Sequence, residues 1–93
     1  MALFDIKLTD DSRAIIKSNP IKFATKLVAR ACDFSNETID IKVDDGDWVD
    51  LKSIMGVLTV NYARGNTISF RIKGTFEDEC AMELQVLANQ LLS

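Results

Sequence analysis

The chain has 93 residues, which fits a single domain spanning residues 1–93. Hydrophobic residues make up 47% and charged residues 27%, a composition typical of folded proteins and not of disordered ones. The net charge is −3, which disfavours nucleic-acid binding through a general basic surface. No apolar run approaches the ~20 residues of a membrane span, and the start of the chain lacks a signal-peptide pattern. We therefore expect a cytoplasmic protein that contacts no membrane.

The sequence contains no histidine. This excludes Ser-His-Asp and Cys-His catalysis, metal ligation by histidine and a phosphohistidine relay on these residues. The sequence also lacks a glycine-rich phosphate loop and a nucleophile placed beside a base. We therefore expect no enzymatic activity, no cofactor and no metal site. Cys32 and Cys80 fall in apolar helical stretches, and we expect both to be buried reduced thiols.

The first third of the chain predicts one strand and one helix. Apolar and polar residues alternate over residues 4–8, the period of a half-buried strand. Residues 10–13 are polar and are interpreted as a break. Asn19 is a good helix cap, and Pro20 fits the first helical position, where its missing N–H costs nothing. Apolar residues at helical spacing then predict a helix that ends near residue 33.

The middle of the chain predicts two strands joined by a hairpin. Residues 39–43 alternate apolar and polar side chains, and residues 48–51 form a short strand after them. Residues 44–47, Asp-Asp-Gly-Asp, are interpreted as the turn, with Gly46 supplying a positive φ. A calcium site in this acidic turn is disfavoured, because the remaining ligands of a calcium loop are missing.

The last part of the chain predicts a short helix, a strand and a closing helix. Ser53 is placed to cap a helix over residues 54–58, and residues 68–73 alternate as the fourth strand. Residues 75–78, Thr-Phe-Glu-Asp, are similar to a capping box at the start of a helix whose buried stripe runs over residues 80–91. The alternating strands leave one sheet face for solvent and one for helices. The sequence thus predicts an α+β sandwich with a four-stranded antiparallel sheet and three helices on one face.

Residues 52–57, Lys-Ser-Ile-Met-Gly-Val, strongly resemble the serine-site motif of HPr, the phosphocarrier of the bacterial sugar phosphotransferase system. The resemblance continues through Gly65, the fourth strand, Gly74 and the acidic start of the last helix. The element order, strand, helix, strand, strand, helix, strand, helix, is also the order that HPr uses. The resemblance implies the HPr-like open-faced sandwich and a role in the phosphotransferase system or in carbon regulation.

The chain departs from HPr where that family carries out its chemistry. The family's active-site histidine and arginine lie at the start of the first helix, and the corresponding stretch here is residues 14–23. An ungapped count places Pro20 at the histidine and Lys22 at the arginine. Matching proline to proline instead places Lys17 at the histidine and Asn19 at the arginine. Neither register offers an imidazole, so the resemblance implies a histidine-less member similar to the catabolite-repression HPr-like protein.

Ser53 has two interpretations. In HPr relatives of this type a dedicated kinase phosphorylates the corresponding serine, and the modified protein acts as a regulator. A phosphate at a helix cap would lie beside free backbone N–H groups and the positive end of the helix dipole. The alternative is that Ser53 only caps its helix, in a structural or interaction domain that is never phosphorylated.

The resemblance also implies a docking surface for proteins, such as an HPr kinase and a transcriptional or metabolic regulator, and the net charge of −3 disfavours direct contact to nucleic acid. The expected partner-binding residues are Lys22, Lys52, Ile54, Met55 and Gly56. A helix as short as 54–58 cannot bury all of its apolar residues. We expect Ile54, with Val57 or Leu58, to enter the core, and Met55 and Gly56 to face outward.

Overall fold

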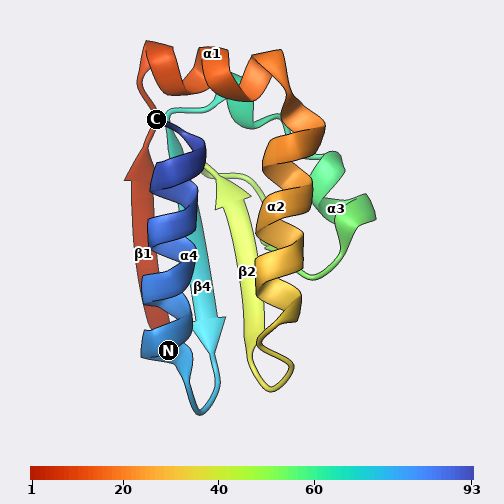
Figure 1. Ribbon diagram of the computed structural model, residues 1–93, viewed down its shortest axis with the longest axis vertical. Helices are drawn as coiled ribbons and strands as arrows, with labels where there is room; N and C mark the ends of the chain where they lie inside the picture. Colours follow the sequence, from red (N-terminus) through yellow and green to blue (C-terminus); the bar gives the residue numbers. More distant parts are fainter.

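The computed structural model describes residues 1–93 and is built on one antiparallel sheet. Its strands are β1 (Ala2–Lys7), β2 (Thr38–Val43), β3 (Val49–Asp50) and β4 (Thr67–Lys73). They lie in the order β1-β4-β2-β3, so β4 and β2 are central and β1 forms one edge (Figure 1). These strands confirm the four that were predicted, although the third is only two residues long.

Alternation divides the sheet into a buried and an open face. The side chains of the central strands that point under the helices are completely or almost completely buried: Ile39, Ile41, Ile68, Phe70 and Ile72. Residues between them lie on the open face. There Asp40 stands opposite Arg71 in the β2–β4 register, and the Arg71 guanidinium donates to Asp40 Oδ2 from Nε at 3.1 Å and from Nη2 at 2.7 Å. This ion pair ties the two central strands together on the side without helices.

Two long helices cover the other face of the sheet. Helices α2 (Pro20–Cys32) and α4 (Glu77–Leu91) run side by side along the direction of the strands, as Figure 1 shows. Each presents a leucine to the core, and Leu27 and Leu84 have no exposed surface. The short helix α3 (Ile54–Leu58) packs beside α2, and a single 3-10 turn, η1 (Tyr62–Arg64), follows it. The arrangement confirms the α+β sandwich.

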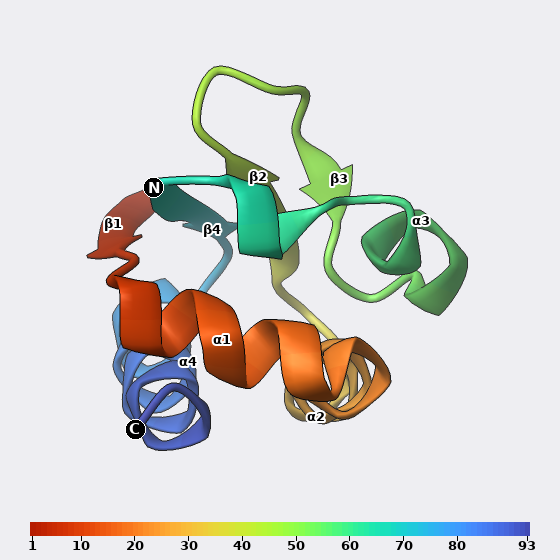
Figure 2. The ribbon, with the colours of Figure 1, turned by 90° about the horizontal axis from the view of Figure 1, so that it is seen from above.

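An additional helix, α1 (Asp10–Ser18), occupies the segment that was predicted to be a polar break. It crosses the end of the sandwich and packs on η1 (Figure 2). Thr9 and Ser12 form a capping box at its start, with Thr9 Oγ1 accepting from Ser12 N at 3.1 Å and Ser12 Oγ accepting from Thr9 N at 2.8 Å. Ile16 is buried on its inner side. The element order is therefore corrected by one helix.

The predicted caps of α2 and α4 have different outcomes. Asn19 caps α2 as expected, with its side-chain oxygen accepting from Lys22 N at 3.1 Å, and Pro20 is the first helical residue. The capping-box interpretation of residues 75–78 is wrong, because α4 begins after Phe76, whose side chain makes no capping bond. The Phe76 N–H donates instead to Glu37 Oε1 at 2.8 Å. The buried Glu37 carboxylate, from the loop before β2, thus accepts a hydrogen bond from the backbone at the start of α4.

The two cysteines also differ from each other. Cys80 is buried on α4, as predicted, and burial raises the pKa of its thiol to about 11. Cys32 is exposed, which corrects the prediction that both thiols are buried. It is the last residue of α2, and its Sγ lies 4.0 Å from the carbonyl oxygen of Lys52.

No helix of the structure is long and apolar enough to span a membrane.

Candidate functional site

Ser53 lies between β3 and α3 and is the N-cap of α3, as predicted. Its backbone is extended, and its Oγ accepts from Gly56 N at 3.4 Å. The Ser53 carbonyl accepts from Val57 N at 3.0 Å, which is the first bond of the helix. The side chain is half-exposed. The hydroxyl therefore faces the free N–H groups at the start of α3 while remaining reachable from solvent.

Lys52 anchors the residue before this cap. Its ammonium donates to the carbonyl oxygens of Phe34 and Glu37, both at 2.6 Å, and its side chain is half-buried. These bonds join the β3–α3 segment to the loop between α2 and β2. The residue expected to contact partners thus directs its charge into the fold. The partner atoms lie 15 and 18 residues away in sequence, so no local pattern could have indicated this contact.

The inner side of α3 is set by Val57 and Gly56. Val57 is completely buried, as one of the two predicted alternatives, whereas Ile54 is only half-buried. Gly56 does not face outward as expected. A Cβ at this position would lie 2.9 Å from Val49 Cγ1, so only glycine lets α3 approach β3 this closely. The correction leaves Gly56 as a packing residue.

Two apolar side chains of α3 remain on the surface. Met55 is 75% exposed, as predicted, and Leu58 is 46% exposed. They are three residues apart and therefore lie on the same side of the helix. A third, Ile21, is exposed in the first turn of α2, next to Pro20. Leu58 and Pro20 line the same groove, whereas Met55 and Ile21 do not line it.

Tyr62 contacts the end of α3 from the buried side. Its hydroxyl donates to the Val57 carbonyl at 3.2 Å, and its ring packs edge-on against Phe23 of α2 with 5.5 Å between ring centroids. Burial raises the pKa of the Tyr62 hydroxyl well above its usual range, so it remains protonated. The short helix is thus fixed by contacts with α2, β3 and η1, although five residues alone would not be stable as a helix.

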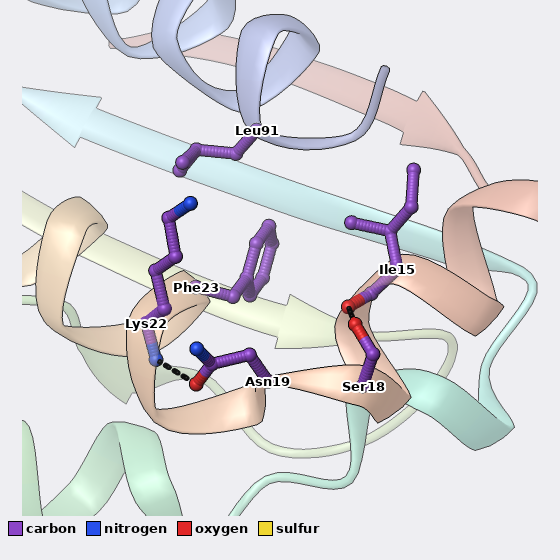
Figure 3. A pocket seen from close by; sticks show the side chains of 6 residues that line it. All are labelled: Ile15, Ser18, Asn19, Lys22, Phe23 and Leu91. Carbon is purple, nitrogen blue, oxygen red and sulfur yellow. Dashed lines mark hydrogen bonds between the residues drawn. The ribbon is translucent and has the colours of Figure 1, made fainter.

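Lys22 lies in a different place from the Ser53 segment. It lines a pocket of about 370 Å³ between the start of α2 and the end of α4, together with Ile15, Ser18, Asn19, Phe23 and Leu91. Figure 3 shows the Lys22 side chain extending toward Leu91 while Asn19 holds its backbone. No residue from 52 to 56 lines this pocket. The structure therefore separates Lys22 from the other expected partner-binding residues.

Three cations flank the start of α2, and the structure places them in different surroundings. The Arg13 guanidinium donates to the carbonyl oxygens of Leu8 and Gly65 at 3.3 and 3.1 Å and pairs with Asp10, so its role is structural. Lys17 faces a groove on the side of η1, away from Lys22. The segment thus contains no converging set of cations.

The acidic hairpin after β2 is held by Asp44. Its carboxylate accepts from the backbone N–H groups of Asn66 and Thr67, with Oδ1 at 3.1 and 3.0 Å. Asp44 also carries the positive φ of 51°, which was expected at Gly46. The shape of the hairpin therefore follows from this side chain and not from the glycine.

Comparison with known families gives one extended match. A family model described as the PTS HPr component phosphorylation site matches residues 21–90. The match begins after Asn19 and Pro20, so it leaves out α1 and the cap of α2. A sequence comparison with curated proteins finds no significant match.

Several solved structures are similar to the chain over most of its length. HPr-C-His from Thermoanaerobacter tengcongensis is 25% identical, with a TM-score of 0.76, and the match covers 99% of this chain and 96% of that one. The histidine-containing phosphocarrier protein of Mycoplasma is 26% identical, with a TM-score of 0.74 and coverage of 98% and 97%. Crh, the catabolite repression protein of Bacillus subtilis, shares the fold at 23% identity, with a TM-score of 0.66 and coverage of 78% and 82%.

Proposed function

Because the chain belongs to the HPr family of the phosphotransferase system, we propose that it is a regulatory protein-binding module that is switched by phosphorylation at Ser53. In this proposal the chain is not an enzyme and binds no cofactor. It works in the bacterial cytoplasm, where an HPr kinase modifies it and a transcriptional or metabolic regulator recognises the modified surface. The proposal is supported by the family match, by the absence of histidine and by the position of Ser53.

The start of α2 offers no group that could carry phosphate between proteins. Asn19 caps the helix with its amide oxygen, and Pro20, the next residue, has neither an N–H nor a reactive side chain. Lys17, the other residue that aligns with the histidine, lies in the last turn of α1. A protonated ammonium is not a nucleophile at neutral pH. The relay chemistry of histidine-containing relatives therefore has no acceptor here.

The observation that carries the proposal is the geometry of the Ser53 hydroxyl. It is half-exposed, and it already lies 3.4 Å from a backbone N–H at the start of α3. A phosphate would add about −1.5 to −2 charge and three acceptor oxygens at this position. The positive end of the helix can accept that charge, so we expect the fold to be retained.

The consequence of phosphorylation would appear on the neighbouring surface. Met55 and Leu58 form an exposed apolar strip on α3, and flexible methionine side chains suit adaptable protein contacts. A phosphate beside this strip favours a partner with an arginine or lysine pocket and disfavours an acidic partner. The module would therefore exchange partners without a change of fold.

A second candidate is an interaction domain that is never phosphorylated. It is favoured by the cap itself, because Ser53 has a structural role that needs no phosphate. The two candidates differ in whether a phosphate at position 53 changes partner binding.

The test uses protein synthesised with phosphoserine at position 53, which removes any dependence on a kinase. Unmodified and phosphorylated chains are used as baits, with a Ser53→Ala chain as the unphosphorylatable control. We expect the phosphorylated bait to retain at least one partner that the other two do not. Identical partners on all three baits would leave the interaction domain as the better explanation.

A further inference from the structure

Strand β1 forms an edge of the sheet, and one side of its backbone is unpaired (Figure 1). The Leu8 N–H donates to the Asn66 carbonyl at 2.8 Å and continues the antiparallel register between β1 and β4. Because hydrogen-bonded pairs alternate along such a ladder, the even-numbered residues of β1 are the ones that bond to β4. The backbone N–H and C=O groups of Leu3, Asp5 and Lys7 therefore point away from the sheet.

The outer edge of β1 also lacks the features that usually prevent a sheet from adding a strand. Proline, a β-bulge or a covering helix protects many natural edges. Strand β1 contains no proline, and its residues pair with β4 one to one, without a bulge. Its extensive contacts are with β4 on the inner side and with α4 on one face. The edge is therefore open to a further strand.

Two charged side chains on this edge are also without a partner. Asp5 and Lys7 are exposed, and they lie on the same face of the sheet because they are two residues apart. Neither makes an ion pair in the structure. A second copy of β1 that runs antiparallel along this edge can place its Lys7 opposite Asp5 and its Asp5 opposite Lys7. The strand thus carries both members of a complementary cross-strand pair.

The neighbouring registers of such a pairing are less favourable. A shift by two residues in either direction places Asp5 opposite Asp5 of the second copy, or Lys7 opposite its Lys7. Like charges directly opposite each other destabilise a strand pair. A further shift places Asp5 opposite Leu3 and leaves both charges unpaired. Charge complementarity therefore selects the register in which Asp5 faces Lys7, which we call the charge-paired register.

The inner side chains of β1 give a second, independent indication. Phe4 and Ile6 are only half-buried, whereas Ile68 and Phe70 beside them on β4 are completely or almost completely buried. The apolar layer is thus incompletely covered at this edge. In the charge-paired register Ile6 lies opposite Ile6 of the second copy, in a non-hydrogen-bonded pair whose Cα atoms are about 4.5 Å apart. Pairing of two copies would therefore remove more of both Ile6 side chains from water.

We propose that the outer edge of β1 pairs with β1 of a second copy of this chain, antiparallel and in the charge-paired register. The backbones exchange two hydrogen bonds in each Asp5–Lys7 pair, and the two-fold axis repeats this pair. The contact is small, so the dimer is weak, with a dissociation constant on the order of 100 µM. Strand β1 lies at the opposite edge of the sheet from β3 and the Ser53 segment, so the inference does not depend on the proposed function.

The first measurement is sedimentation velocity of the full chain over a series of concentrations on both sides of this dissociation constant. We expect a reversible equilibrium between monomer and dimer, and a dimer that weakens as sodium chloride is added. A chain that stays monomeric at the highest concentration, or a dimer that salt does not affect, would overturn the proposal.

Amide hydrogen exchange, followed by NMR, tests the register. The Asp5 and Lys7 amides should become protected as the protein concentration rises. The Leu3 amide should stay unprotected, because Thr9 of the second copy faces it and the Thr9 backbone is already bonded to Ser12 Oγ and to Arg13 N. Protection of Leu3 as well would indicate a shifted register and contradict the charge pairing. Association that leaves all three amides unprotected, as in exchange of β1 between copies, would overturn the edge pairing itself.

Charge-reversal variants test the partner of each side chain. Asp5→Lys alone and Lys7→Asp alone each place like charges opposite each other twice, so each should weaken the dimer about 10-fold or more. An equal mixture of these two variants should form mixed dimers about as tightly as the unmodified chain, because every charge then faces its opposite. Lys73→Asp, the same change at an exposed, unpaired lysine of β4, is the control and should leave the affinity nearly unchanged.

The mixture is the decisive result. All three side chains are on the surface, so folding should persist and is checked by circular dichroism. Failure of the mixture to associate, or an equal loss of affinity in Lys73→Asp, would show a general charge effect and contradict the pairing of Asp5 with Lys7. Ser53→Ala should form the dimer as the unmodified chain does, and a loss of the dimer in this variant would place the contact at another edge.

Discussion

The ammonium of Lys52 donates a hydrogen bond of 2.6 Å to the carbonyl oxygen of Glu37. This contact joins the residue before the Ser53 cap to the loop that precedes β2. Glu37 in turn accepts from Phe76 N through its buried carboxylate. Glu37 therefore connects the β3–α3 segment, through its backbone carbonyl, to the start of α4, through its side chain.

Replacing Lys52→Met should destabilise the protein by about 1–3 kcal/mol, because two partly buried carbonyl oxygens lose their donor. Urea denaturation followed by circular dichroism measures the change. Lys73→Met is the matched control, since Lys73 is exposed and unpaired, and its effect should stay within about 0.5 kcal/mol. Similar values for both variants would show that the Lys52 contacts contribute nothing specific.

Gly74 should not tolerate a side chain. Its φ is +158°, and a Cβ would lie 2.8 Å from Glu37 Cγ and 3.0 Å from Glu37 Cα. Gly74→Ala therefore combines backbone strain with a clash against a buried residue, and we expect a loss of about 1–3 kcal/mol in the free energy of unfolding. Gly46→Ala has less effect in this account, because Gly46 adopts no positive φ and its single close neighbour is Val43 O at 3.0 Å. A larger loss of stability for Gly46→Ala than for Gly74→Ala would contradict this account.

The core leucines of the two long helices provide a test of the fold. Leu84 is fully buried on α4, while Met82 on the same helix is 68% exposed. Leu84→Ala should cost about 2–5 kcal/mol in urea denaturation, through lost burial and the cavity that remains. Met82→Ala should change the stability by no more than about 0.5 kcal/mol. A loss well under 1 kcal/mol for Leu84→Ala would mean that the buried face of α4 is wrongly assigned.

Ionisation of the Cys80 thiol should lower the free energy of unfolding as the pH becomes alkaline. Its pKa is about 11 in the folded protein, compared with about 8.5 for a free thiol. Between these values the folded state binds more protons than the unfolded state, so the free energy of unfolding falls as the pH rises. Cys80→Ala should flatten this fall relative to the unmodified chain, as measured by urea denaturation from pH 8 to pH 11. Identical slopes for both proteins would exclude the contribution of Cys80.

Alternating apolar residues were sufficient to predict three of the strands, and the buried Ile68, Phe70 and Ile72 are an example of that period. The short third strand was predicted from the hairpin turn before it. Helix α1 was missed because its first turn is polar and Ile16 is its only buried apolar residue. The local signal was nevertheless present in the sequence, since Thr9 and Ser12 have the spacing of a capping box. The helix is therefore indicated by its capping residues and not by its hydrophobic pattern.

The candidate site was only partly accessible to sequence reasoning. Ser53 could be predicted as a cap because capping is a local interaction between neighbouring residues. The roles of Lys52 and Gly56 could not, because each depends on residues that the fold brings from elsewhere in the chain, Glu37 for one and Val49 for the other. Contacts of this kind leave no periodicity in the sequence.

The central claim is that Ser53, and no residue near the start of α2, accepts phosphate. The direct measurement is intact and peptide mass spectrometry of the chain after incubation with an HPr kinase and ATP, beside a sample incubated with enzyme I and phosphoenolpyruvate. Ser53→Ala is the test variant, and Thr59→Ala, which removes an exposed hydroxyl at the other end of α3, is the control. The account predicts one phosphate on Ser53 from the kinase, lost only in Ser53→Ala, and none from enzyme I. Phosphate transferred from enzyme I, or an unlabelled Ser53, would contradict it.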